Sequence, residues 1–338
     1  MDGFFDKYGR MIIIAVAICF VLLYLTPMRN VVGSSINGFA GNFANKVGES
    51  LGTVKMPDGS DNIEKEPSSM LINGESFRKK IPSEATSILF TNEKAPKGSS
   101  VVDLTQTHDS DVVGWLDGTT WKVSTQDIKK SVTFNTDSSL MFYDMETLKS
   151  IDFSMVDTSQ VTNMYGMFDW SKNLEKLDLS TFDTSKVEDM QYMFAFCKNL
   201  RSLDLKNFDT SNVTNMSYMF QGCKMLTTLD VSHFDTSKVE AMSRVFEECE
   251  SLTTLNLGNW KTSNLWCTYR MFYGCKNLQE LDLSHFDTTK IENPTKNMND
   301  MFGSCYSLKS IKVHSQTDID KFKTGNLWIN NDTKIEIK

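Results

Sequence analysis

Five cysteines recur at one spacing, and a row of thiols can support disulfide, metal or redox chemistry. Cys197, Cys223, Cys249 and Cys275 are 26 residues apart, and Cys305 follows after 30. If successive units stack about 5 Å apart, as paired strands do, the distances between Cα atoms would permit disulfide bonds. Side chains in a ladder point the same way and not at each other. Buried free thiols are therefore the favoured interpretation, with a disulfide pair or a metal cluster as the alternative.

Five aspartates recur in the same way and are the candidate binding residues. Asp204, for example, lies between Leu203 and Leu205, so it should lie on the exposed face of a strand whose leucines point inward. Like charges on neighbouring strands repel each other unless a partner or a cation offsets them. We expect this acidic face to bind a partner. Weak divalent-cation binding is one alternative, and a solvated face whose aspartates bond to Ser and Thr hydroxyls is another. The predicted partner-binding residues are Asp152, Asp178, Asp204, Asp230 and Asp282.

The sequence contains no recognisable catalytic residue set. Of the four histidines, His233 and His285 hold one loop position, where other units have Thr181 or Asn207. A catalytic base would not be placed at so tolerant a position. No glycine-rich phosphate loop, zinc-ligand spacing or nucleophile motif is present. We therefore predict that the protein is not an enzyme and has no cofactor, bound metal or small-molecule substrate. A net charge of −8 with 35 basic residues also argues against nucleic acid as a partner.

The recurring positions belong to an internal repeat of 26 residues, in which each unit contains a helical period followed by a strand period. Leu203 and Leu205 alternate with Asp204, which is typical of a short strand. The preceding residues step by three, one, three and three, as on one face of a helix of about three turns. This predicts an α/β solenoid, leucine-rich-repeat-like, of about seven strand-turn-helix units. The helix-face residues of one unit are Met190, Met193, Phe194, Cys197 and Leu200.

The N-terminus carries an apolar run from Met11 to Leu25, preceded by Lys7 and Arg10 and followed by Arg29. The run is short for a spanning helix of about 20 residues, but its flanks can supply the missing length. An uncleaved signal-anchor is favoured over a cleaved signal peptide. The basic residues place the N-terminus in the cytoplasm and the repeats outside the cell.

These patterns divide the chain into six segments. Small β-rich caps should cover the two ends of the repeats, because terminal units must hide their apolar rows. The segment 53–82 is rich in Gly, Pro, Ser and charged residues, which is typical of a linker. The predicted segments are a transmembrane signal-anchor (1–30), an amphipathic membrane-proximal helix (31–52), a flexible linker (53–82), an N-terminal cap (83–139), the leucine-rich-repeat solenoid (140–313) and a C-terminal cap (314–338).

The repeat consensus M-x-x-M-F-x-x-C-x-x-L-x-x-L-D-L-S-x-F-D-T-S-x-V-x-x-M, represented by residues 190–216, resembles the BspA-like leucine-rich-repeat surface proteins of Gram-positive bacteria and mollicutes. The resemblance implies a cell-surface binding protein and implies little about its ligand. We expect a single-pass, membrane-anchored bacterial surface protein that uses its repeat face for adhesion or recognition, with a protein or glycan on a host or neighbouring cell as the partner. The alternative is a structural subunit of a surface or membrane assembly, with a pilin-like N-terminal helix and a repeat head.

Overall fold

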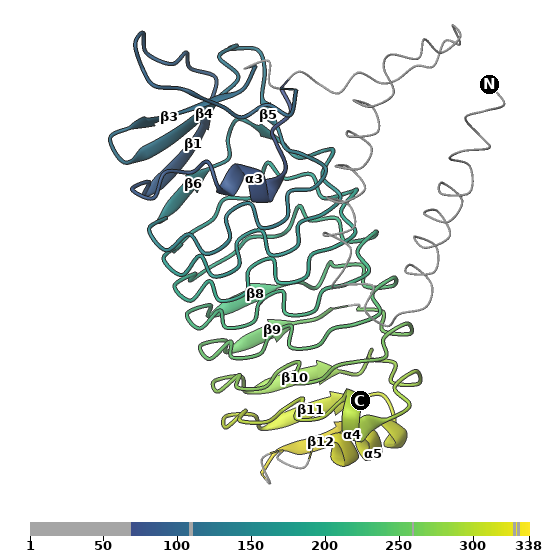
Figure 1. Cartoon of the computed structure of the whole chain (residues 1–338). Coiled ribbons are helices and arrows are strands. Elements are labelled where there is room, and N and C mark those ends of the chain that lie inside the picture. The colour runs from purple at the N-terminus through teal and green to yellow at the C-terminus, as the bar shows by residue number, and fades with distance from the viewer. Residues whose placement is uncertain (1–68, 108–110, 259, 327–328, 330–331) are drawn as a thin grey trace, which may run out of the picture. The chain divides into compact units, whose positions relative to one another are not determined.

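The computed structural model describes residues 69–107, 111–258, 260–326, 329 and 332–338 (Figure 1). The chain divides into two units, 1–64 and 65–338, and every described element belongs to the second. In chain order the elements are α3 (Gly74–Arg78), β1 (Ser87–Thr91), β2 (Val102–Asp103), β3 (Val113–Asp117), β4 (Thr120–Ser124), β5 (Val132–Thr133), β6 (Ser150–Asp152), β7 (Val156–Asp157), β8 (Thr228–Asp230), β9 (Thr254–Asn256), β10 (Glu280–Leu283), α4 (Pro294–Asn297), β11 (Ser310–Val313), α5 (Gln316–Gly325) and β12 (Lys334–Ile337).

A five-stranded sheet in the order β2-β3-β4-β1-β6 joins the N-terminal cap to the first repeat. Strands β3 and β4 form an antiparallel hairpin, and Gly118 supplies the positive φ of 60° that its tight turn requires. Strand β1 pairs in parallel with both β4 and β6, the strand of the first repeat. The predicted linker differs from the structure over its described part. Leu71 and Phe77 are fully buried there, and α3 begins at an Asn73 cap.

Each repeat is hydrogen-bonded to the next one along its Met-Phe segment. The Phe194 amide donates to the Met219 carbonyl at 2.9 Å, and the Phe168 amide donates to Met193 at 2.9 Å. The phenylalanines themselves form a buried stack along the array, with neighbouring ring centroids between 5.4 and 5.8 Å apart. This stack is the centre of the core, because no single repeat could bury its own ring. Its members are Phe142, Phe168, Phe194, Phe220, Phe246, Phe272 and Phe302.

The prediction of an α/β solenoid is wrong. The described part of the chain contains three helices, α3, α4 and α5, and none of them covers the Met-Phe segment of a repeat. The strands form four separate sheets, of five, three, two and two strands, and not one continuous parallel sheet. The helical period misleads because Tyr192 and Phe196 have φ values of 60° and 55°, which a right-handed helix excludes. Between them Met193 closes a turn by donating to Met190 at 3.2 Å.

The membrane predictions are also corrected. The longest helix in the described ranges is α5, with 10 residues, and none there is long and apolar enough to cross a bilayer, which takes about 20. On this finding the predicted single-pass membrane localisation is withdrawn. The predicted signal-anchor (1–30), the membrane-proximal helix (31–52) and the pilin-like arrangement built on them lie outside the described residues.

The C-terminal end of the array is closed by strands and short helices. Strand β11 pairs in parallel with β10 and β12, so the sheet continues past the last repeat. Four extra residues in the sixth repeat form most of α4, which packs on α5. The Asn326 side chain, just after α5, accepts the Phe302 amide at 3.2 Å.

Candidate functional site

The five predicted binding aspartates all lie at the exposed position of equivalent repeat segments. Asp152, Asp230 and Asp282 are in β6, β8 and β10, whereas the segments around Asp178 and Asp204 form no regular strand. Each one is exposed and stands between two buried apolar residues, as Asp204 does between Leu203 and Leu205. In β8, β9 and β10 the same alternation places Thr228, Thr254 and Glu280 beside them on the exposed side. The alternation predicted from the sequence therefore brings these side chains to one face.

Each of these aspartates also accepts a hydrogen bond from the backbone amide two residues further on, which closes a turn. The Oδ1 atom of Asp178 accepts the amide of Ser180 at 3.0 Å, and that of Asp230 accepts the amide of Ser232 at 3.0 Å. Asn256 occupies the equivalent position and accepts the Gly258 amide at 3.0 Å. An amide oxygen thus serves this turn as well as a carboxylate does. The negative charge is not needed for the local fold.

Hydrogen bonds stabilise the ionised form of several of these carboxylates. Bonds from Ser180 and Ser232 lower the pKa values of Asp178 and Asp230. The backbone and side chain of Lys206 lower the pKa of Asp204, and its Nζ lies 3.0 Å from Oδ2. Burial acts to raise the pKa of Asp282, but bonds from Lys338 and Ser284 outweigh it and leave the pKa at about 2. These four aspartates are therefore negatively charged at neutral pH.

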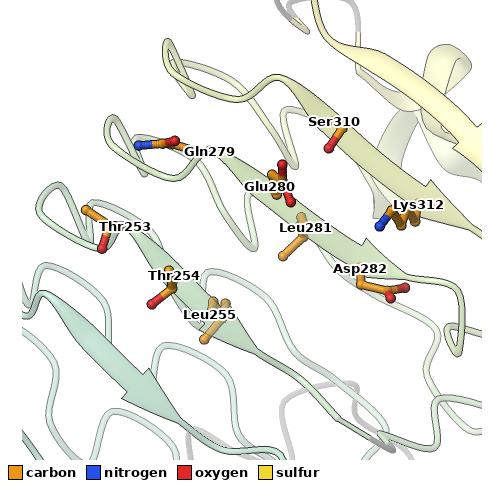
Figure 2. Close-up of a pocket in the computed structure, with 9 residues that line it drawn as sticks. All are labelled: Thr253, Thr254, Leu255, Gln279, Glu280, Leu281, Asp282, Ser310 and Lys312. Carbon is orange, nitrogen blue, oxygen red and sulfur yellow. The ribbon is translucent and has the colours of Figure 1, made fainter.

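Two hollows lie along this face. One, of about 650 Å³, is lined by Asp204, Asp230 and His233, whose Nε2 lies 3.0 Å from the Leu205 carbonyl. The other, of about 520 Å³, lies over β9, β10 and β11. Figure 2 shows Asp282 and Lys312 on adjacent strands there, and the strand register pairs them directly. Each hollow thus holds a lysine beside its carboxylates, Lys206 in the first and Lys312 in the second.

The predicted cysteine column is buried and its thiols make hydrogen bonds. Cys197 and Cys223 donate to the carbonyls of Phe168 and Phe194, each at 3.1 Å. Ser171 holds the same position in the second repeat, that of Phe168, and its hydroxyl donates to the Phe142 carbonyl at 2.5 Å. The six cysteines of the described ranges are free and buried. No group of three His, Cys, Asp or Glu side chains in that part of the chain could hold a metal ion.

A second group of charged residues lies on the Met-Phe segments and was missed from the sequence. Glu247 directly follows Phe246, and its side chain is only 4% exposed. It binds Arg244 at 3.2 Å and Arg270 at 3.0 Å. The sequence did carry a signal for this position. The residue after the phenylalanine is Ala195 in one unit and Gly303 in another, and such small residues indicate a buried position. The acidic residue at the same position in an earlier repeat is Asp169, which is also buried.

Comparison with known proteins identifies the repeats. A family model described as "Mycoplasma protein of unknown function, DUF285" matches residues 136–253 and 226–333. The two matches overlap and together run from 136 to 333, which is more than half of the chain. No curated protein and no solved structure matches.

Proposed function

Because the chain belongs to the family described as Mycoplasma proteins of unknown function, DUF285, we propose that it is a recognition protein of the BspA-like leucine-rich-repeat type. It binds a protein or glycan partner through the outer face of its repeat strands. The observation that carries this proposal is the row of exposed aspartates, whose charge the turns do not need. Asn256 makes the same turn without a charge. Since the turn can form without a charge, the row of charges on this face favours a role in binding.

The shape and chemistry of the face support the same function. The two hollows offer carboxylates, hydroxyls and one imidazole on a surface fixed by strand pairing. Such groups suit hydrogen bonds to glycan hydroxyls or to the basic side chains of a protein. The proposal includes no catalytic step. Binding at the acidic part of the face should weaken as ionic strength rises, because salt screens exposed charges.

The acidic face can be tested with charge-neutral variants that keep the fold. In the triple variant D178N/D204N/D230N each amide oxygen can still accept the turn N–H, as Asn256 does. The matched control is D183N/D209N/D235N. It removes three aspartates that close similar turns away from the strands, by accepting the amides of Ser185, Ser211 and Ser237.

The two triple variants and the unmodified chain would be applied to a glycan array and to an array of purified cell-surface proteins. We expect a ligand that the unmodified chain and the control bind, and that the strand-face variant binds at least about tenfold more weakly, as for the loss of a charge-assisted hydrogen bond. Equal binding of that ligand by all three proteins would rule out the acidic face as the binding site.

A further inference from the structure

Asp169 is a buried carboxyl group on the Met-Phe segment of its repeat, away from the strand face. It is 9% exposed, and its Oδ1 atom is buried with no hydrogen-bond partner among the described residues. An unpaired buried polar atom costs about 1–3 kcal/mol, and more when it is charged. In the part of the chain that the structure describes, Asp169 is the only carboxyl group with such an atom.

Three repeats later the chain contains the same site with its carboxylate paired, although the Nε atoms of Arg244 and Arg270 there have no hydrogen-bond partner within the described ranges. Glu247 follows Phe246 as Asp169 follows Phe168. Its carboxylate binds Arg244 in its own repeat, Arg270 in the next and the Nε2 of Gln221 in the previous one, the last at 2.6 Å. Tyrosine rings complete the arrangement. The Arg244 guanidinium lies 5.1 Å from the ring centroid of Tyr269 and 5.7 Å from that of Tyr218.

Around Asp169 the same positions lack these donors. The residue equivalent to Arg244 is Gly166, which has no side chain, and the residue equivalent to Arg270 is Tyr192. Aromatic surface is nonetheless present, since the rings of Tyr165 and Tyr192 lie 5.5 Å apart. Both rings are close enough to Asp169 for its charge to raise their pKa values, although burial is the larger cause. The site thus has a carboxyl group and two aromatic rings but no cation.

We propose that Asp169, together with the rings of Tyr165 and Tyr192, binds an arginine side chain of a partner protein. The incoming guanidinium would take the place that Arg244 occupies beside Glu247, because the Tyr192 side chain already stands at the position equivalent to Arg270. Arginine fits better than lysine, because its planar group can pair with a carboxylate through two N–H donors while stacking on aromatic rings. The end of the Leu140 side chain lies 2.8 Å from the position of a Cβ added at Gly166, so Leu140 must move aside for the guanidinium. This site lies on a different segment of the repeat from the proposed strand face, so either can be correct without the other.

The electrostatics of the free site agree with this assignment. Burial raises the pKa of Asp169 to about 7, and the nearby Asp144 acts in the same direction against the Trp170 amide, which lowers it. A carboxyl group in this state gains most from a cation that arrives with its own hydrogen-bond donors, because binding offsets the cost of ionising it in place.

The first test uses N-acetyl-arginine amide as the probe and N-acetyl-citrulline amide as its uncharged match. The full-length chain, labelled with ¹³C in its tyrosine rings, is titrated with each probe and followed by NMR. We expect saturable shifts of the Tyr165 and Tyr192 ring signals with the arginine probe only, weakened at least about tenfold in D169N. Equal shifts with both probes, no shift with either, or arginine shifts that survive D169N would each overturn the proposal.

The second test supplies the arginine within the chain. G166R places it where Arg244 stands three repeats later, with G166Q as the uncharged control. The backbone tolerates a side chain there, since Arg244 and Tyr192 have φ values of 58° and 60° in the same column. The added Cβ would lie 2.8 Å from the end of the Leu140 side chain, which must shift in both variants, and 3.6 Å from the Cβ of Asp169. We expect G166R to unfold at a higher temperature than G166Q and to abolish the probe shifts. The D169N/G166R and D169N/G166Q pair should lose that difference in unfolding temperature. The same difference with and without Asp169 would overturn the proposal.

Discussion

At the scale of single residues, the buried polar side chains of this array are mostly those that form a hydrogen bond to a neighbouring repeat. The cysteine column is used for its weak hydrogen-bond donor as well as for its size, since each thiol donates to a phenylalanine carbonyl of the preceding repeat and Ser171 replaces it with a hydroxyl. Burial raises the pKa of Cys223 to about 12, so this thiol stays protonated and able to donate at neutral pH. Asp169 differs from this pattern, because its Oδ1 atom is buried without such a partner.

The raised pKa of Asp169 predicts a specific pH dependence of stability. The carboxyl holds its proton in the folded chain up to a pH of about 7, whereas in the unfolded chain it ionises near 4. The folded state therefore binds more protons between these values, and its free energy of unfolding falls as pH rises through that window. D169N removes this contribution. Urea denaturation at several pH values from 4 to 8 measures the free energy of unfolding of both proteins. As pH rises, this free energy should fall more for the unmodified chain than for D169N. Parallel curves would contradict it.

At the scale of the structural element, the repeat depends on two columns of left-handed residues. One directly precedes the Met-Phe pair and includes Tyr192, and the other lies two residues after the phenylalanine and includes Phe196. The backbone amides along this segment alternate between a partner in the next repeat and a partner in their own repeat. The Tyr192 and Phe194 amides bond to the next repeat, whereas that of Met193 closes a local turn. This alternation links neighbouring repeats where an α-helix would have bonded only to itself.

Two positions of the second column test the cost of this conformation. Ser304 has a φ of 58° and Gly274 has a φ of 74°. S304G should raise the free energy of unfolding and G274S should lower it, each by up to about 1 kcal/mol, because only glycine adopts this region without strain. The Cβ added at Gly274 meets no atom closer than 3.5 Å, so its effect reports the backbone alone. The measurement is chemical denaturation. Changes of the same sign in both variants would contradict the argument.

The sequence predicted which side chains around the aspartates are buried, but it predicted neither these turns nor the lack of a regular strand at residues 203–205. Alternation around Asp204 correctly predicted an exposed aspartate between buried leucines, since side chains of extended backbone point to opposite faces. Steps of three and four residues did not predict the local structure, because a turn with left-handed residues returns side chains to the core at the same intervals as a helix. Glycines at 166, 222 and 274 were the available signal for positive φ. In other repeats the same columns hold Tyr, Phe or Arg, and these residue types do not indicate a positive φ.

At the scale of the whole repeat array, stability is the sum of contacts between neighbours. The ring of Phe220 lies 5.7 Å from Phe194 on one side and 5.7 Å from Phe246 on the other. The repeats are linked in series, so damage at one of them should spread to the repeats on both sides before it reaches the caps. This behaviour separates the array from a globular core, in which one cavity weakens the whole domain together.

Replacing Phe220 by Ala should lower the free energy of unfolding by about 3–5 kcal/mol, the cost of a cavity at a fully buried ring. Amide hydrogen exchange followed by mass spectrometry should speed up first in peptides covering Phe194 to Phe246, with the N-terminal sheet affected least. Y306A, at a ring that is 68% exposed, serves as the control. Uniform acceleration across all peptides would show that the array unfolds as one unit.

The constant spacing of 26 residues between repeats also limits how the chain can change in length. Removing residues 195–220 would join Phe194 to Gln221 and leave each column one member shorter but unbroken. The sixth interval is compatible with this rule, because α4 takes up its extra residues and the ladder then resumes, with the Thr268 amide donating to Asn297 at 2.7 Å. Recombination in the gene at steps of one repeat can therefore lengthen or shorten the exposed face while the columns remain continuous. Variation in the number of repeats is thus open to this protein at little cost to its folding.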